Sequence, residues 1–203
     1  LFADRLAQKT GARVYVVLYS HLPQHQFKTA YREITQVYQQ VYDQIPVSNI
    51  TLLGDSAGGG LAAGFCEYCA ATDLPQPGHL VLISPWLDLD LNNPTITKYE
   101  AHDVTLSVKG LRRVAKLWAA GEKHDDYRLS PINGDVSQMR DVFVCVGTRE
   151  IMYPDSALFV KKLRDTKVPV KFVVGRDLPH IFPVYRMPEA DQVMTEITKI
   201  VNN

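Results

Sequence analysis

The chain has 203 residues, of which 46% are hydrophobic, 22% charged and 9% aromatic. This composition lies near the globular average and the length fits one domain, so disorder, collagen-like repeats and two full domains are excluded. Lysine plus arginine (22) equals aspartate plus glutamate (22), which leaves no net charge to attract nucleic acid or an acidic membrane surface. We therefore expect a single domain over residues 1–203 that binds no nucleic acid.

The apolar runs and the cysteines indicate whether the protein spans a membrane, forms disulfides or binds a metal. Runs such as residues 14–18 and 80–83 are far shorter than the ~20 residues of a membrane helix, so no membrane span is expected. Three cysteines form no disulfide framework, and Cys66 and Cys69 lack a second ligand pair, which favours core packing over metal binding. No secretory leader opens the sequence. These patterns predict a soluble protein in a reducing compartment, the cytoplasm.

In chain order, residues 1–9 have helical spacing and end at Gly11, a residue typical of helix C-termini. Because this pattern is already under way at Leu1, with no initiator Met, we expect the chain to begin within a fold. Residues 13–19 are β-branched and aromatic and predict a strand buried on both faces. A long helix is expected over residues 30–42, closed by Pro46.

The remaining segments repeat a strand-helix alternation. Strands are expected over residues 49–53, 79–83, 142–146 and 168–174, and helices from about 57 to 70, over 154–165 and over 188–201. The more polar residues 86–140 are expected to form loops and short helices beside a site, with one helical pattern over 111–120. Alternation of this kind predicts an α/β fold, a mostly parallel sheet with helices on both faces.

The sequence Gly54-Asp55-Ser56-Ala57-Gly58 lies where a buried strand ends and a helix begins. That context places Ser56 on a strained turn with its hydroxyl exposed, as a nucleophile requires. We expect Gly54 and Gly58 to remove Cβ atoms that would collide there, and the Ala57 N–H to face the oxygen of an attacked carbonyl. A glycine-rich turn that binds an anion is the alternative reading.

A serine nucleophile needs a histidine base and a carboxylate, and in this architecture the chain order is serine, acid, histidine. Of the six histidines, only His180 follows the last strand; the others begin a strand or precede the fourth. The acid is expected after the fourth strand, where Glu150 is favoured over Asp155 because the start of a helix already accounts for a carboxylate at 155. Asp177 is a third candidate.

These residues resemble the α/β-hydrolase fold, and within it the hormone-sensitive-lipase-like carboxylesterases. The resemblance runs through nearly the whole chain, and it implies a triad of Ser56, Glu150 and His180 with no metal or organic cofactor. Its motifs, in the family's order, are residues 19–30 with Pro23, His25 and Phe27, Gly54 to Gly59, Ser84-Pro85-Trp86, Asp103 with Leu106-Ser107, Ser130-Pro131, Gly147 to Glu150, and His180-x-Phe182.

One motif of that family is absent: His-Gly-Gly-Gly, which supplies the other oxyanion donors. In the family it would precede Leu1, on a strand between those expected at residues 13–19 and 49–53. We therefore expect the 203 residues to be part of a longer polypeptide or to be completed by a second chain. Direct pairing of the two flanking strands would contradict this expectation.

The resemblance predicts a serine carboxylesterase for small to medium uncharged esters. A thioesterase or peptidase would use the same residues, and the alternative from another class is a non-catalytic ligand-binding or truncated protein on the same fold, without a complete oxyanion hole. Dimerisation through the edge strand at residues 168–174 is a further expectation. Four residues are candidates to line the ester pocket, although its aromatic members also fit plain core packing: Asp55, Trp86, Tyr153 and Phe182.

Overall fold

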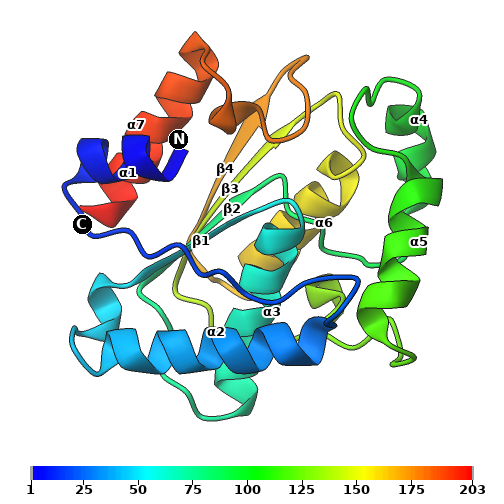
Figure 1. Ribbon diagram of the computed structural model, residues 1–203. Coiled ribbons are helices and arrows are strands. Elements are labelled where there is room, and N and C mark those ends of the chain that lie inside the picture. Colours follow the sequence, from blue (N-terminus) through cyan, green and yellow to red (C-terminus); the bar gives the residue numbers. More distant parts are fainter. Residues whose placement is uncertain (1, 203) are drawn as a thin grey trace.

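A computed structural model describes residues 2–202, so Leu1, which the first expected helix included, lies outside the described residues. Four parallel strands form a sheet in the order β1-β2-β3-β4 (Figure 1). This confirms the expected α/β class with a parallel sheet. The strands are β1 (Thr51–Asp55), β2 (His79–Ile83), β3 (Asp141–Gly147) and β4 (Val170–Gly175).

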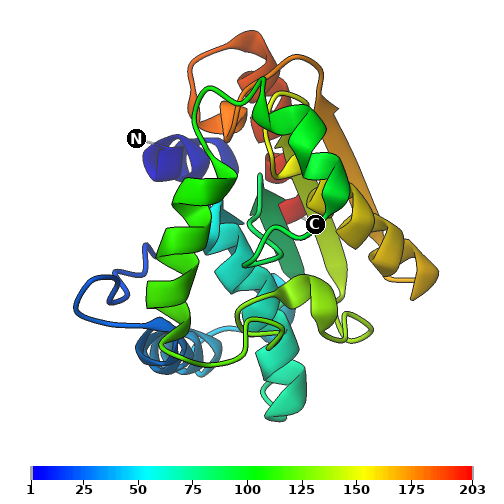
Figure 2. The same ribbon diagram turned by 90° about the vertical axis from the view of Figure 1, so that its right-hand side faces the viewer.

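Helices cover both faces of the sheet because its central strands are apolar on both sides. Alternate residues of β2 and β3 point to opposite faces, as the period of two along a strand requires. Leu80, Leu82 and Val144 pack against α3 (Ala57–Ala71) and α6 (Tyr153–Asp165). On the other face, Val81 and Phe143 are among the residues that pack against α1 (Phe2–Thr10) and α7 (Pro188–Val201). The turned view shows α3 and α6 in front of the strands and α7 behind them (Figure 2).

An outer layer packs on α3. The buried residues of α2 (Phe27–Tyr42) recur at intervals of three and four, and two of them, Tyr31 and Tyr38, contact Phe65 of α3 with ring centroids 6.3 and 5.3 Å apart. The remaining helices are α4 (Thr97–Glu100) and α5 (Val108–Ala119), with short 3₁₀ turns at Val47–Asn49, Pro94–Ile96, Pro131–Asn133 and Phe182–Val184. None of the helices in residues 2–202 has the length and apolar character needed to cross a membrane.

The strand expected over residues 13–19 is wrong for the described structure. This segment is irregular and pairs with no strand in residues 2–202. Its apolar side chains are in part solvent-facing, with Val16 65% and Leu18 91% exposed. A strand exists only through hydrogen bonds to a neighbour, so β-propensity without a neighbour leaves the segment irregular. The two strands expected to flank a further one are therefore not paired with each other.

Parallel strands bring their carboxyl ends to one edge of the sheet, and ligands of open α/β sheets bind in the crevice there. Ser56 follows β1, Ser84 follows β2, Glu150 lies shortly after β3, and His180 lies in the loop after β4. The topology alone therefore gathers these four residues, which are far apart in sequence.

Candidate active site

Ser56 lies in a sharp turn between β1 and α3. Its backbone has φ 51° and ψ −120°, an unfavourable conformation for a residue with a side chain, which the surrounding structure must hold. The Ser56 N–H donates to the Ile83 carbonyl at 2.9 Å, and the Ser56 carbonyl accepts from the N–H groups of Gly60 (3.1 Å) and Trp86 (2.9 Å). These bonds tie the turn to the end of β2 and to the first turn of α3.

The glycines around Ser56 have different roles. A Cβ at position 54 would lie 2.2 Å from the Gly58 carbonyl oxygen, and one at position 60 would lie 2.0 Å from the Trp86 carbonyl oxygen. Position 54 therefore requires glycine where β1 meets the start of α3, and position 60 where α3 meets the loop after β2. We also expected a Cβ at position 58 to collide with its surroundings. That expectation was wrong, because a Cβ there would meet nothing within 4 Å.

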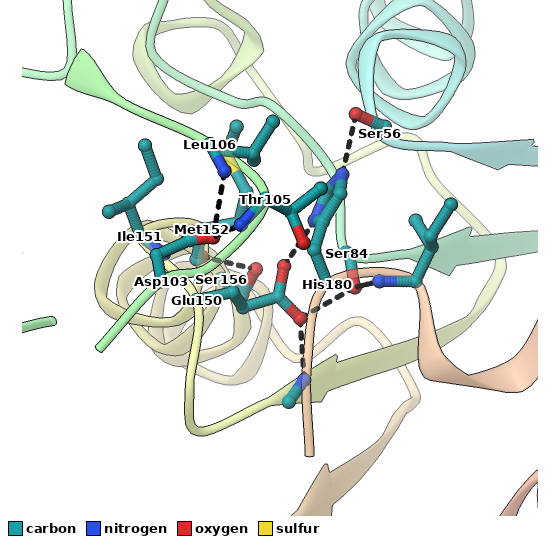
Figure 3. A network of polar contacts seen from close by, with 12 residues as sticks. Ser56, Ser84, Asp103, Thr105, Leu106, Glu150, Ile151, Met152, Ser156 and His180 are labelled. Carbon is teal, nitrogen blue, oxygen red and sulfur yellow. Dashed lines mark hydrogen bonds and ion pairs between the residues drawn. The ribbon is translucent and has the colours of Figure 1, made fainter. Parts of the chain in front are cut away.

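Three side chains form a continuous hydrogen-bonded chain at this edge of the sheet (Figure 3). His180 Nε2 lies 2.9 Å from Ser56 Oγ, and His180 Nδ1 lies 2.5 Å from Glu150 Oε2. An ionised carboxylate can only accept hydrogen bonds, so Nδ1 carries the proton and Nε2 is free to accept from the Ser56 hydroxyl. His180 (3% exposed) and Glu150 (0%) are both buried, which shields their pairing from solvent.

The other two carboxylates considered for the acid lie elsewhere. Asp155 is buried in the first turn of α6, where its Oδ1 accepts from Asn93 Nδ2 at 2.9 Å. Burial raises the pKa of Asp155 to about 6, and the Asn93 hydrogen bond partly opposes that rise. Asp177 is exposed, and its backbone N–H donates to Thr148 Oγ1. Within the described residues, Glu150 alone of the three carboxylates contacts His180.

Two polar residues at this site were not assigned a role from the sequence. The Ser84 hydroxyl donates to Glu150 Oε1 at 2.7 Å, and the Gly147 N–H donates to the same oxygen at 2.7 Å. Asp103 Oδ2 accepts from the Ile151 N–H at 2.9 Å and so ties residue 151 to the loop at residues 103–106. A polar residue directly after each parallel strand is the signal that could have found Ser84; Asp103 lies in a loop and carries no such signal.

The four candidate pocket residues do not form one group. Trp86 and Tyr153 belong to the same apolar cluster, and the Trp86 indole N–H donates to the Asp88 carbonyl at 2.7 Å. Phe182 is 1% exposed and packs in the cluster on the opposite face of the sheet, against Gly175. Asp55 is exposed at the end of β1.

Comparison with known proteins gives a consistent picture. Residues 1–184 match a family described by the alpha/beta hydrolase fold. The chain is 30% identical over 202 residues to an esterase of Acinetobacter venetianus, covering 98% of this chain and 67% of the relative. It is 29% identical over 190 residues to an acetyl-hydrolase of Streptomyces hygroscopicus, covering 92% of this chain and 64% of the relative.

The solved structures agree with the sequence matches. A hormone-sensitive lipase from a metagenome library superposes with a TM-score of 0.93 at 26% identity, covering 98% of this chain and 70% of that one. The chain thus spans about two thirds of the length of the relatives that it matches.

Proposed function

The chain belongs to the alpha/beta hydrolase family, and from this premise we propose that it is a serine carboxylesterase that hydrolyses small to medium uncharged esters. The observation that carries the proposal is the chain of hydrogen bonds from Ser56 through His180 to Glu150. The relatives named esterase and acetyl-hydrolase support an ester of a short acyl group as the substrate.

In the proposed reaction His180 Nε2 removes the Ser56 hydroxyl proton as Oγ attacks the ester carbonyl. Glu150 accepts from Nδ1, keeps the imidazole in the required tautomer and stabilises the imidazolium that forms. When the tetrahedral intermediate collapses, the C–O bond to the alcohol breaks and His180 returns the proton to the leaving oxygen. Water, deprotonated by the same nitrogen, then attacks the acyl-enzyme, which releases the acid and restores Ser56.

The oxyanion would be held first by the Ala57 N–H. Ala57 begins α3, and the first N–H groups of a helix have no acceptor within it. They also lie at the positive end of the helix dipole, which favours a developing negative charge. Removing one oxyanion donor from a serine hydrolase costs about 10²–10³ in rate. We therefore propose that a second donor is needed for full activity.

We propose that further polypeptide, of this chain or of a partner, supplies that donor beside β1. Within residues 2–202, β1 pairs with β2 on one edge and with no strand on the other. The exposed apolar side chains of residues 15, 16 and 18 also support added chain on this side. A homodimer through β4, the opposite edge strand, is a separate prediction.

The pocket prediction is retained for Trp86 and Tyr153. Tyr153 follows Glu150 by three residues and packs against Tyr99, with ring centroids 5.3 Å apart. These partly apolar walls support an uncharged substrate, since an ionised group would lose hydration there without a partner.

Turnover of p-nitrophenyl esters with two, four, eight and twelve acyl carbons tests the proposal. We expect the highest kcat/KM on the short esters and its loss in both Ser56→Ala and His180→Ala. Turnover that persists unchanged in either variant would remove the mechanism. No turnover by the folded protein with the added polypeptide beside β1 in place would favour the non-catalytic alternative.

A further inference from the structure

Ser84 is held in an unusual position directly after β2. It is fully buried and has φ 47°, in the left-handed region that a residue with a side chain rarely adopts. Its backbone N–H donates to the Cys145 carbonyl of β3 at 2.7 Å. The backbone strain and the anchored amide together aim the Ser84 hydroxyl toward the loops that follow β3 and β4.

The Ser84 hydroxyl joins the acid and the base of the site. It donates to Glu150 Oε1 at 2.7 Å and accepts from the N–H of Ile181, the residue after His180, at 3.0 Å (Figure 3). A backbone N–H can only donate and a carboxylate can only accept, so the direction of both hydrogen bonds is fixed. Ser84 Oγ therefore contacts both the Glu150 carboxylate, which bonds to the His180 imidazole, and the backbone of the residue next to His180.

The remaining contacts of Glu150 show what Ser84 adds. Oε2 is occupied by His180 Nδ1, while Oε1 accepts from Ser84 and from the Gly147 N–H. Gly147 is the last residue of β3, three residues before Glu150, so its amide ties the carboxylate to the end of its own strand. Beside the direct bond of Oε2 to His180, Ser84 adds a second link between the carboxylate and the loop of His180, through the backbone N–H of Ile181.

We infer that Ser84 is a positioning residue of the Ser56-His180-Glu150 arrangement, which sets the distance and angle between Glu150 and His180 without touching the substrate. The inference rests on the proposed esterase function. Loss of the hydroxyl removes one of the two donors to Glu150 Oε1 and leaves the partly buried Ile181 amide without its acceptor. Misplacement of a catalytic group by about 1 Å can cost about 10²-fold in rate.

Ser130 offers a matched control. It is fully buried like Ser84, and its hydroxyl also makes two bonds between separate segments, donating to the His124 carbonyl (2.6 Å) and accepting from the Leu89 N–H (2.8 Å). None of these groups contacts Glu150, His180 or Ser56. Ser130→Ala therefore reports the cost of losing a buried bridging hydroxyl that serves packing alone.

The first experiment compares kcat and KM of Ser84→Ala and Ser130→Ala on one short ester, well below both melting temperatures. We expect Ser84→Ala to lower kcat by about 10- to 100-fold with KM changed by less than about twofold, and Ser130→Ala to leave kcat within about twofold. An unchanged kcat in Ser84→Ala, with the parent protein active, would overturn the inference and leave the esterase proposal standing. An inactive parent protein would instead overturn the proposed function.

A double-mutant cycle separates positioning from a general structural role. If Ser84 acts through Glu150, adding Ser84→Ala to Glu150→Ala should change the residual kcat by less than about twofold. The same loss in both backgrounds would overturn the inference. Should Ser84→Ala not fold, Ser84→Gly replaces it in both experiments, because glycine adopts φ 47° without strain.

Discussion

At the scale of single residues, Glu150 and Asp155 show how the environment divides two nearby carboxylates. Both are buried, yet Glu150 accepts from Ser84, Gly147 and His180, whereas Asp155 accepts from Asn93. In the described residues the second oxygen of Asp155 has no partner. Both oxygens of Glu150 therefore accept hydrogen bonds, one of them from the histidine, as the acid of such an arrangement requires.

This difference leads to a paired prediction. Glu150→Gln should lower kcat by about 10⁴-fold, because an amide that donates toward Nδ1 favours the wrong imidazole tautomer. Asp155→Asn should leave kcat within about threefold, since its removal touches neither His180 nor Ser56. The measurement is kcat on a short p-nitrophenyl ester at one pH. A larger loss of kcat in Asp155→Asn than in Glu150→Gln would show that Glu150 is not the acid.

At the scale of elements, the strand-to-helix turn depends on close backbone contact. A Cβ at position 54 would collide with the Gly58 carbonyl, which is backbone and cannot rotate away. We expect Gly54→Ala to lower the free energy of unfolding by about 1–3 kcal/mol or more, as overpacking does. Thermal unfolding followed by circular dichroism measures this change.

Gly58 is the control on the same turn. Its Cβ would meet nothing within 4 Å, and alanine favours helix over glycine. We expect Gly58→Ala to unfold at the same temperature as the parent or slightly above it. Equal destabilisation by both substitutions would show that the turn tolerates no side chain at either position, against the contacts seen here.

Local patterns predicted most of the elements that hold the site. Residues 79–83 formed a strand with the expected bounds because an apolar run between turn residues decides such a segment locally. His180 was predicted from chain order alone. The position of Ser84 directly after a strand was a usable signal, but the partners of Ser84 and Asp103 were beyond local pattern, since their bonds to Glu150 and Ile151 span 66 and 48 residues of sequence. The strand prediction for residues 13–19 was also wrong because it rested on local propensity. A strand needs a neighbouring strand to pair with, and propensity does not supply one.

At the scale of the whole molecule, one buried acid outside the site affects stability. Glu67 on α3 is 4% exposed, and in the described residues neither carboxylate oxygen has a hydrogen-bond partner. Burial raises the pKa of Glu67 from 4.5 to about 9, although Lys162 partly offsets that rise. The native protein therefore holds a proton on Glu67 that the unfolded chain releases above its own pKa.

The raised pKa of Glu67 makes the stability of the folded protein depend on pH. Because the folded-state pKa of Glu67 lies above its unfolded value of 4.5, its contribution to stability is fully present below pH 4.5 and is lost as the pH rises toward about 9. The loss amounts to about 1.4 kcal/mol per pH unit within that window. The free energy of unfolding should thus fall between pH 5 and pH 8.

Glu67→Gln tests this account, since the amide is neutral in both states. We expect its melting temperature to exceed that of the parent by several degrees at pH 8 and by much less at pH 5. Glu189→Gln, at an exposed position of α7, should shift the melting temperature equally little at both pH values. A Glu67→Gln shift that does not grow with pH would contradict the assignment of a neutral buried Glu67.

The central claim, that Ser56 is a nucleophile activated by His180, is tested most directly by covalent labelling with a fluorophosphonate. Intact mass followed by peptide mapping should find a single adduct on Ser56 of the parent protein. Labelling should be at least about 10²-fold slower in His180→Ala, which removes the base. A folded parent protein that gains no adduct, or whose labelling is unaffected by His180→Ala, would contradict the account.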